Sequence, residues 1–162
     1  MDIKLATKED IPGVYKLLME LAEFEQLAHA VVGNEQDIEK WAFGNDKVIT
    51  VYCGWYEGRM IGYTLHYTTF STFQCRPGLY IEDIYVQPEY RGKGFGKQLL
   101  LHVCKLANDK GYGRVEWQVL RWLKPSIAFY ESLGAQPLND WTQYRLIGEP
   151  LEHHANAYSR ID

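Results

Sequence analysis

A short glycine-rich segment near the middle of the chain has the residue types and spacing to bind an anion. Gly92, Gly94 and Gly96 follow a run of β-branched and aromatic residues, 80–86, and precede an apolar stripe at helical spacing. This order predicts a strand, a turn and a helix. Glycine lets backbone N–H groups face a ligand, and the first N–H groups of a helix lack intrahelical partners. Such a site suits a pyrophosphate.

Other interpretations of this loop are a plain strand-to-helix connection and two known nucleotide motifs. A dinucleotide fingerprint needs G-x-G-x-x-G, and here the third glycine comes one residue too early. A Walker loop needs Gly-Lys followed by Ser or Thr, which is absent. The plain connection stays open on spacing alone.

The elements around this loop alternate between the two periodicities of secondary structure. Period-two alternation and β-branched runs predict strands, and caps with apolar stripes predict helices. Predicted strands cover 3–6, 48–55, 60–70, 80–86, 114–120 and 141–147, and predicted helices begin after Asp10, at Asn34, at Gly94 and at Pro125. The order β-α-α-β-β-β-α-β-α-β predicts an α/β fold with a mixed, mostly antiparallel twisted sheet flanked by helices. We expect one domain over 1–148 and a C-terminal tail over 149–162.

Composition excludes several classes of function. The 162 residues carry a net charge of −4, which argues against a nucleic-acid partner. No apolar run reaches the length of a membrane span, and the N-terminus lacks the apolar core of a signal peptide. The three cysteines, Cys53, Cys75 and Cys104, are odd in number and widely spaced, which predicts reduced thiols, no metal site and a cytoplasmic protein.

The loop and its flanking strand also carry a family resemblance. Arg91-x-x-Gly94-x-Gly96 matches the Arg/Gln-x-x-Gly-x-Gly/Ala loop of GNAT-type N-acetyltransferases, and Glu82-Asp83-Ile84-Tyr85-Val86 resembles the central strand of that family. From residue 6 to about residue 146 the chain resembles the spermidine/spermine (diamine) branch, which includes thialysine acetyltransferases. The resemblance implies the GNAT fold, acetyl-CoA as co-substrate, no metal and a homodimer.

The resemblance implies where acetyl-CoA binds. The loop would hold the pyrophosphate, and the central strand would pair with the pantetheine arm where the sheet splays open. The implied contacts are Ile84, Tyr85, Val86, Arg91, Gly92, Lys93, Gly94, Phe95, Gly96, Lys97 and Ser126.

Acetyl transfer to an amine needs a base for the amine and an acid for the departing thiolate. Glu82 is the candidate base, because burial in an apolar strand would raise its pKa. By strand alternation, Asp83 should face the opposite side. The alternative is that Glu82 caps a backbone group or pairs with an arginine. Tyr130 is the candidate acid by resemblance, although its helical spacing with Ile127 and Leu133 also fits a core position.

The resemblance also implies an amine site, with Phe24, Glu25, Glu116, Trp117 and Gln118 as the implied contacts. Phe24 stands where a tyrosine is common, and the loop 71–74 lacks an expected acidic residue. A shorter amine is therefore an alternative to spermidine as the implied substrate. The predicted activity is acetyl transfer to the primary amine of a small polyamine, diamine or thialysine-like substrate in a direct ternary complex. The alternatives are a protein or peptide N-acetyltransferase, if 26–33 leaves an open groove, and a catalytically silent coenzyme A sensor.

Overall fold

The computed structural model describes residues 1–158, which form two compact units. The first is Met1–Leu120, and the second begins at Arg121. The predicted boundary at residue 148 stays a prediction.

A five-stranded sheet organises the first unit, in the order β1-β2-β3-β4-β5. The pairs from β1 to β4 are antiparallel, and β4 pairs with β5 in parallel. This confirms the predicted mixed, mostly antiparallel sheet. The strands are β1 (Asp2–Leu5), β2 (Thr50–Tyr56), β3 (Arg59–Ser71), β4 (Arg76–Val86) and β5 (Val115–Trp117).

Three helices of the first unit begin close to their predicted starts. They are α1 (Ile11–Phe24), α2 (Glu35–Phe43) and α3 (Phe95–Asp109). Pro12 lies in the first turn of α1, where a missing N–H costs nothing. The Asn34 side chain accepts hydrogen bonds from the N–H groups of Gln36 and Asp37 and so caps α2. Short 3₁₀ turns occupy Lys8–Asp10, Ala28–Ala30 and Pro88–Tyr90.

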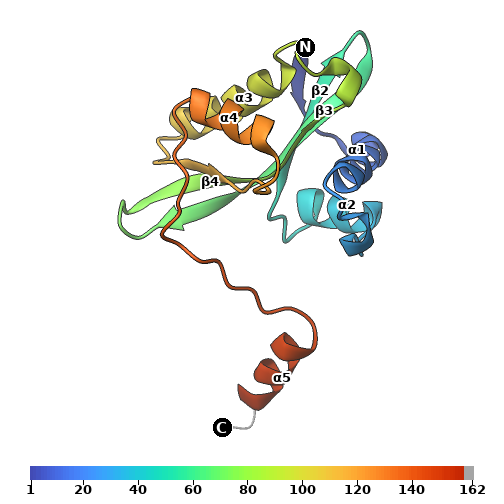
Figure 1. Cartoon of the computed structure of the whole chain (residues 1–162). Helices are drawn as coiled ribbons and strands as arrows, with labels where there is room; N and C mark the ends of the chain where they lie inside the picture. Colours follow the sequence, from blue (N-terminus) through green and yellow to red (C-terminus); the bar gives the residue numbers. More distant parts are fainter. Residues whose placement is uncertain (159–162) are drawn as a thin grey trace. The chain divides into compact units, whose positions relative to one another are not determined.

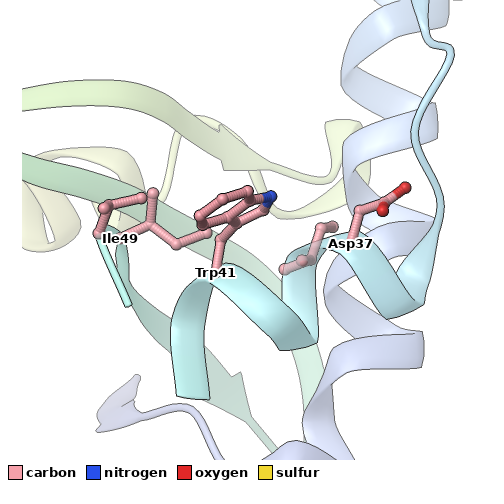
Figure 2. Close-up of a pocket in the computed structure, with 5 residues that line it drawn as sticks. Asp37, Trp41 and Ile49 are labelled. Atoms are coloured by element: carbon pink, nitrogen blue, oxygen red, sulfur yellow. The ribbon is translucent and has the colours of Figure 1, made fainter. Parts of the chain in front are cut away.

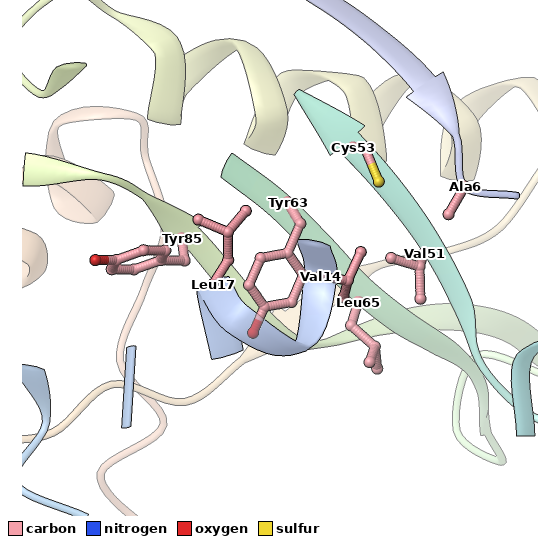
Figure 3. Packing of buried hydrophobic residues seen from close by; sticks show 8 residues of the cluster. All are labelled: Ala6, Val14, Leu17, Val51, Cys53, Tyr63, Leu65 and Tyr85. Carbon is pink, nitrogen blue, oxygen red and sulfur yellow. The ribbon is translucent and has the colours of Figure 1, made fainter. Parts of the chain in front are cut away.

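Helices α1 and α3 pack on opposite faces of the sheet (Figure 1). Val14 and Leu17 of α1 pack in one cluster with Tyr63, Leu65 and other residues of the central strands (Figure 3). Phe95 and Leu99 of α3 pack in a second cluster with Ile61 and Val86. Because Tyr85 joins the first cluster and Val86 the second, the end of β4 is buried on both faces.

The second unit contains α4 (Lys124–Ser132) and α5 (Glu149–Tyr158). The predicted strand at 141–147 is wrong, because this segment has no regular structure and Trp141 and Tyr144 are exposed. A sequence suited to a strand forms one only when a neighbour pairs with its backbone. The predicted strand at 114–120 is likewise shortened to three residues.

Two further sequence expectations can be compared with the part of the chain that the structure describes. Cys53, Cys75 and Cys104 are all free thiols. No helix within residues 1–158 is both long and apolar enough to cross a membrane.

Candidate active site

A β-bulge interrupts β4 at the two adjacent acidic residues. Asp83 pairs with Leu65 of β3, but Ile81 pairs with the next β3 residue, His66, so Glu82 is the extra residue. A bulge breaks the strict alternation of side chains along a strand. Glu82 and Asp83 consequently line the same pocket. The prediction that they face opposite sides is therefore wrong.

This pocket, which we call the acidic pocket, has a volume of about 420 Å³. It lies between α1, the segment after α1, α2 and β4. Its acidic lining residues are Glu25, Asp37, Glu82 and Asp83, and its other lining residues are Tyr15, Leu18, Leu21, Ala22, Leu27, Ala30, Val31, Val32, Gly33, Asn34, Ile38 and Leu65. No lysine, arginine or histidine is among them, so its electrostatics favour a cation.

The carboxylates of the acidic pocket differ in their surroundings. Glu82 is exposed, so its predicted burial is wrong. Asp83 is partly buried, and burial raises its pKa to about 6, while the hydrogen bond from Tyr63 acts in the opposite direction. Burial also raises the pKa of Glu25. The Asp37 carboxylate is engaged in the cap of α2, where it accepts a hydrogen bond from the N–H of Asn34.

The segment 26–33 forms one wall of the acidic pocket. Gln26 adopts a left-handed conformation with φ of 62°, which ends α1 and turns the chain back. The N–H of Leu27 then donates to the carbonyl of Ala22 at 2.7 Å. Further along, the Tyr15 hydroxyl donates to the carbonyl of Gly33 at 3.1 Å. Both ends of this wall are thus fastened to α1.

Beyond the bulge, one edge of β4 has no strand beside it. β5 pairs only with residues 79–81, within the part of the chain that the structure describes. The N–H of Gln87 donates to Ile61 on β3, and successive residues of a strand point their backbone groups to opposite edges. The backbone groups of Ile84 and Val86 therefore face the open edge, and those of Tyr85 face β3.

The glycine loop, residues 91–97, joins this open edge to the start of α3. Gly92 and Gly94 have φ of 75° and 80°, a conformation that side chains rarely tolerate. A Cβ added to Gly92, Gly94 or Gly96 would meet no atom within 4 Å. The first intrahelical bond runs from the N–H of Gln98 to the carbonyl of Gly94. The N–H groups of 95–97 thus have no partner within the helix, as an anion site requires.

Arg91 connects the glycine loop to both β4 and α1. Its Nε donates to the carbonyl of Val86 at 2.9 Å. Its guanidinium lies 4.4 Å from the ring centroid of Phe24 and 5.5 Å from that of Tyr85. Phe24, predicted to contact the amine, is not among the residues that line the acidic pocket. Its neighbour Glu25 does line it.

The sequence matches the model of the acetyltransferase (GNAT) family over residues 13–135. This match covers most of the chain, including both β4 and the glycine loop.

The chain belongs to the GNAT acetyltransferase family.

Relatives and solved structures agree with this assignment. The thialysine N-epsilon-acetyltransferase of Bos taurus is 35% identical over 94% of this chain and 96% of its own length. The L-ornithine N5-acetyltransferase of Arabidopsis thaliana is 31% identical over 93% of this chain and 86% of its own. An integron cassette protein of Vibrio cholerae has the same fold, with a TM-score of 0.79, 23% identity and coverage of 95% and 96% of the two chains.

This GNAT acetyltransferase has a backbone that fits coenzyme A. The open edge of β4 offers the N–H groups of Ile84 and Val86 and the carbonyl of Ile84 to a pantetheine arm. The space beside the three glycines and the unpartnered N–H groups of α3 suit the diphosphate. Lys93 and Lys97 add positive charge to this end of the GNAT domain.

Other predicted contacts of the GNAT enzyme lie elsewhere in the chain. Glu116 on β5 forms an ion pair with Nε of Arg114 at 2.8 Å. Glu116, Trp117 and Gln118 are not among the lining residues of the acidic pocket. Tyr130 and Ser126 lie on α4 in the second unit. The ring centroids of Phe129 and Tyr130 are 5.3 Å apart. Their assigned roles stay predictions.

A second hollow of the GNAT domain, about 350 Å³, lies beside α2 (Figure 2). Trp41 and Ile49 form its apolar wall, and Asp37 is its acidic residue. Since the Asp37 carboxylate already serves the cap of α2, this hollow offers no uncommitted acid or base. The candidate active site is therefore the acidic pocket together with the open edge of β4.

Sequence reasoning missed two features of this site. Strand alternation puts Asp83 on the wrong face, and periodicity gives no sign of Tyr63, whose hydroxyl donates to Asp83 at 3.0 Å. One available signal was the pair of adjacent acids in an otherwise apolar strand. Strict alternation would have placed one of them against the core, and a bulge avoids that cost.

Proposed function

We propose that this protein transfers the acetyl group of acetyl-CoA to the primary amine of a small polyamine, diamine or thialysine-like substrate in a direct ternary complex. The observation that carries this proposal is the acidic pocket, where Glu25, Glu82 and Asp83 converge without a basic residue in the lining. An ammonium group is attracted by such a cluster, and the apolar residues beside it accept a short methylene chain.

The wall formed by 26–33 favours a small amine over a peptide. A peptide substrate needs an open groove for its backbone. Here Leu27, Val31 and Gly33 line the pocket, and the hydroxyl of Tyr15 fastens the end of the wall. This arrangement supports a compact substrate.

The relatives support the same class of substrate. Their names specify acetylation of thialysine at the epsilon nitrogen and of L-ornithine at N5. Both positions are side-chain amines at the end of a short flexible chain. We infer that the acidic pocket accepts a similar terminal amine.

The open edge of β4 and the acidic pocket adjoin along the stretch 82–86, which supports simultaneous binding of both substrates. Bound acetyl-CoA supplies the acetyl group as a thioester, whose carbon–sulfur bond breaks as the new carbon–nitrogen bond forms. In this proposal Glu82 accepts a proton from the ammonium group, directly or through water. Tyr130 donates its phenolic proton to the departing sulfur, and the second proton that the nitrogen loses on forming the amide restores the phenol. Glu25 and Asp83 hold the amine by charge.

A steady-state panel of amines tests the proposal. Spermidine, spermine, putrescine, thialysine, lysine and ornithine are compared with a peptide at fixed acetyl-CoA. We expect turnover with at least one small amine and intersecting lines when both substrate concentrations are varied. Faster turnover of the peptide would support the protein-acetyltransferase alternative, and parallel lines would contradict the ternary complex.

The silent-sensor alternative has a separate outcome. A sensor would bind acetyl-CoA, measured by calorimetry, and acetylate none of the amines. Such a result would overturn the enzymatic proposal while leaving the assignment of the glycine loop intact.

A further inference from the structure

A buried tyrosine donates a hydrogen bond to one of the carboxylates that line the acidic pocket. Tyr63 lies in the centre of β3 with 0% of its surface exposed, and it packs against α1 (Figure 3). Its hydroxyl donates to Oδ2 of Asp83 at 3.0 Å. A hydroxyl at this depth needs a polar partner, and the partner is a carboxylate that lines the pocket.

The position of Asp83 gives this contact a role beyond packing. Asp83 pairs with Leu65, two residues from Tyr63, so it lies on the same face of the sheet as Tyr63, and it also borders the pocket. One carboxylate oxygen therefore accepts a hydrogen bond from the core. A carboxylate held in this way presents a fixed anion to an incoming ammonium group.

We propose that Tyr63 is a positioning residue for the amine, because its hydroxyl holds Asp83 ionised and oriented at the wall of the acidic pocket. This inference rests on the proposed function for its link to the amine. The contact between Tyr63 and Asp83 itself stands on the geometry of β3 and β4 alone.

The charges around Asp83 explain why it needs this donor. Glu82 from its own strand and Glu25 at the end of α1 are both acidic, and their charges raise the Asp83 pKa further. Asp37 from α2 and Tyr15 from α1 line the same pocket and bring no positive charge. Burial is the largest of the causes that raise the Asp83 pKa. The hydrogen bond from the Tyr63 hydroxyl lowers this pKa, because it favours the charged carboxylate.

The variant Tyr63→Phe removes the hydroxyl and keeps the ring in the core. Loss of this donor should raise the Asp83 pKa beyond the value of about 6 that it has in the wild-type protein, so a larger fraction of Asp83 is protonated near pH 6.5. We expect the amine KM to rise about five- to tenfold there, with little change in the acetyl-CoA KM. By pH 8.5 Asp83 ionises in both proteins, so the ratio of the two amine KM values falls.

Two controls separate this effect from general loss of structure. Tyr15→Phe also removes a hydroxyl near the pocket, but its partner is the Gly33 carbonyl, so any change in amine KM should not depend on pH. In an Asp83→Asn background, Tyr63→Phe should no longer change the pH dependence of the amine KM. A ratio of amine KM values that is the same at every pH would overturn the inference.

A stability measurement tests the hydrogen bond between Tyr63 and Asp83 independently of activity. The folded-state Asp83 pKa exceeds its ordinary value, so the folded protein loses stability as pH rises through the interval between the two. Tyr63→Phe widens that interval, so its deficit in denaturant midpoint should grow as pH rises from 5 to 8. A deficit independent of pH overturns the inference even if amines are acetylated. If no amine is acetylated but the deficit grows, only the proposed function fails.

Discussion

Two regions adjoin one short stretch of β4, and their polar groups are of opposite character. The acidic pocket, beside the bulge, offers side-chain carboxylates to a cation. The glycine loop, which begins five residues after Val86, offers chiefly backbone N–H groups at the start of α3 to an anion. A side-chain site is altered by removing a charge. A backbone site is altered by adding atoms where the structure leaves space.

Phe24 and Glu25 show how sharply the two regions divide. Glu25 lines the acidic pocket, whereas the ring of Phe24 lies against the guanidinium of Arg91. Adjacent residues at the end of α1 thus belong to different regions of the candidate site. Substitutions at these two positions should change different Michaelis constants.

The largest expected effect belongs to neither binding region. Tyr130→Phe should lower kcat about a hundredfold or more, because a general acid contributes that much to turnover. Both Michaelis constants should stay near their wild-type values. Steady-state kinetics with both substrates varied provides the measurement, and an unchanged kcat would remove Tyr130 from the proposed chemistry.

Enlarging Gly96 should weaken the coenzyme site next most strongly. Gly96→Leu places a side chain where no atom lies within 4 Å, at the N–H groups assigned to the diphosphate. We expect the acetyl-CoA dissociation constant to rise at least about tenfold, since charge-assisted hydrogen bonds are lost. Calorimetry measures this change.

Gly96→Ala is the matched control, because the family loop accepts alanine at this position and leucine and alanine are both good helix formers. Neither variant should unfold the protein, which thermal denaturation checks. Coenzyme binding at wild-type strength by Gly96→Leu would mean that the diphosphate lies elsewhere.

Removing one charge from the acidic pocket should have a moderate effect. Glu25→Gln keeps the shape of the side chain and lowers the attraction for an ammonium group. The amine KM should rise about fivefold, with the acetyl-CoA KM unchanged. Glu23→Gln, on the same helix but outside the lining, is the control. Equal effects of the two changes would contradict a local role for Glu25.

The smallest expected effect tests Phe24. Phe24→Leu removes the ring beneath Arg91, and an exposed cation–π contact is worth about a two- to fivefold change in affinity. We expect this change in the acetyl-CoA KM, while Phe24→Tyr retains the wild-type value. A change in the amine KM instead would restore Phe24 to the amine site predicted from the sequence.

Local signals were sufficient to predict most elements of the first unit. Asn34 and Pro12 marked helix starts through their backbone chemistry, and alternation along 60–70 predicted β3. The glycine loop was predicted because positive φ at Gly92 and Gly94 is a property of single residues. These features depend on residues close together in the chain.

The features that sequence reasoning missed depend on distant partners. The bulge at Glu82 follows from the register of β4 against β3, and the bond between Tyr63 and Asp83 joins residues twenty positions apart. The segment 141–147 has the composition of a strand but no strand conformation. In each case the deciding quantity is which backbone lies alongside, which periodicity does not report.

The hydrogen bond from Arg91 to Val86 has a further consequence for solubility. An uncovered strand edge is a template onto which another chain can add and begin aggregation. Here the Val86 carbonyl is already occupied by the Arg91 side chain, so an added strand would have to forgo that bond or displace an arginine. This contact thus discourages strand addition from neighbouring molecules at an edge that, within residues 1–158, no strand pairs with beyond residue 81.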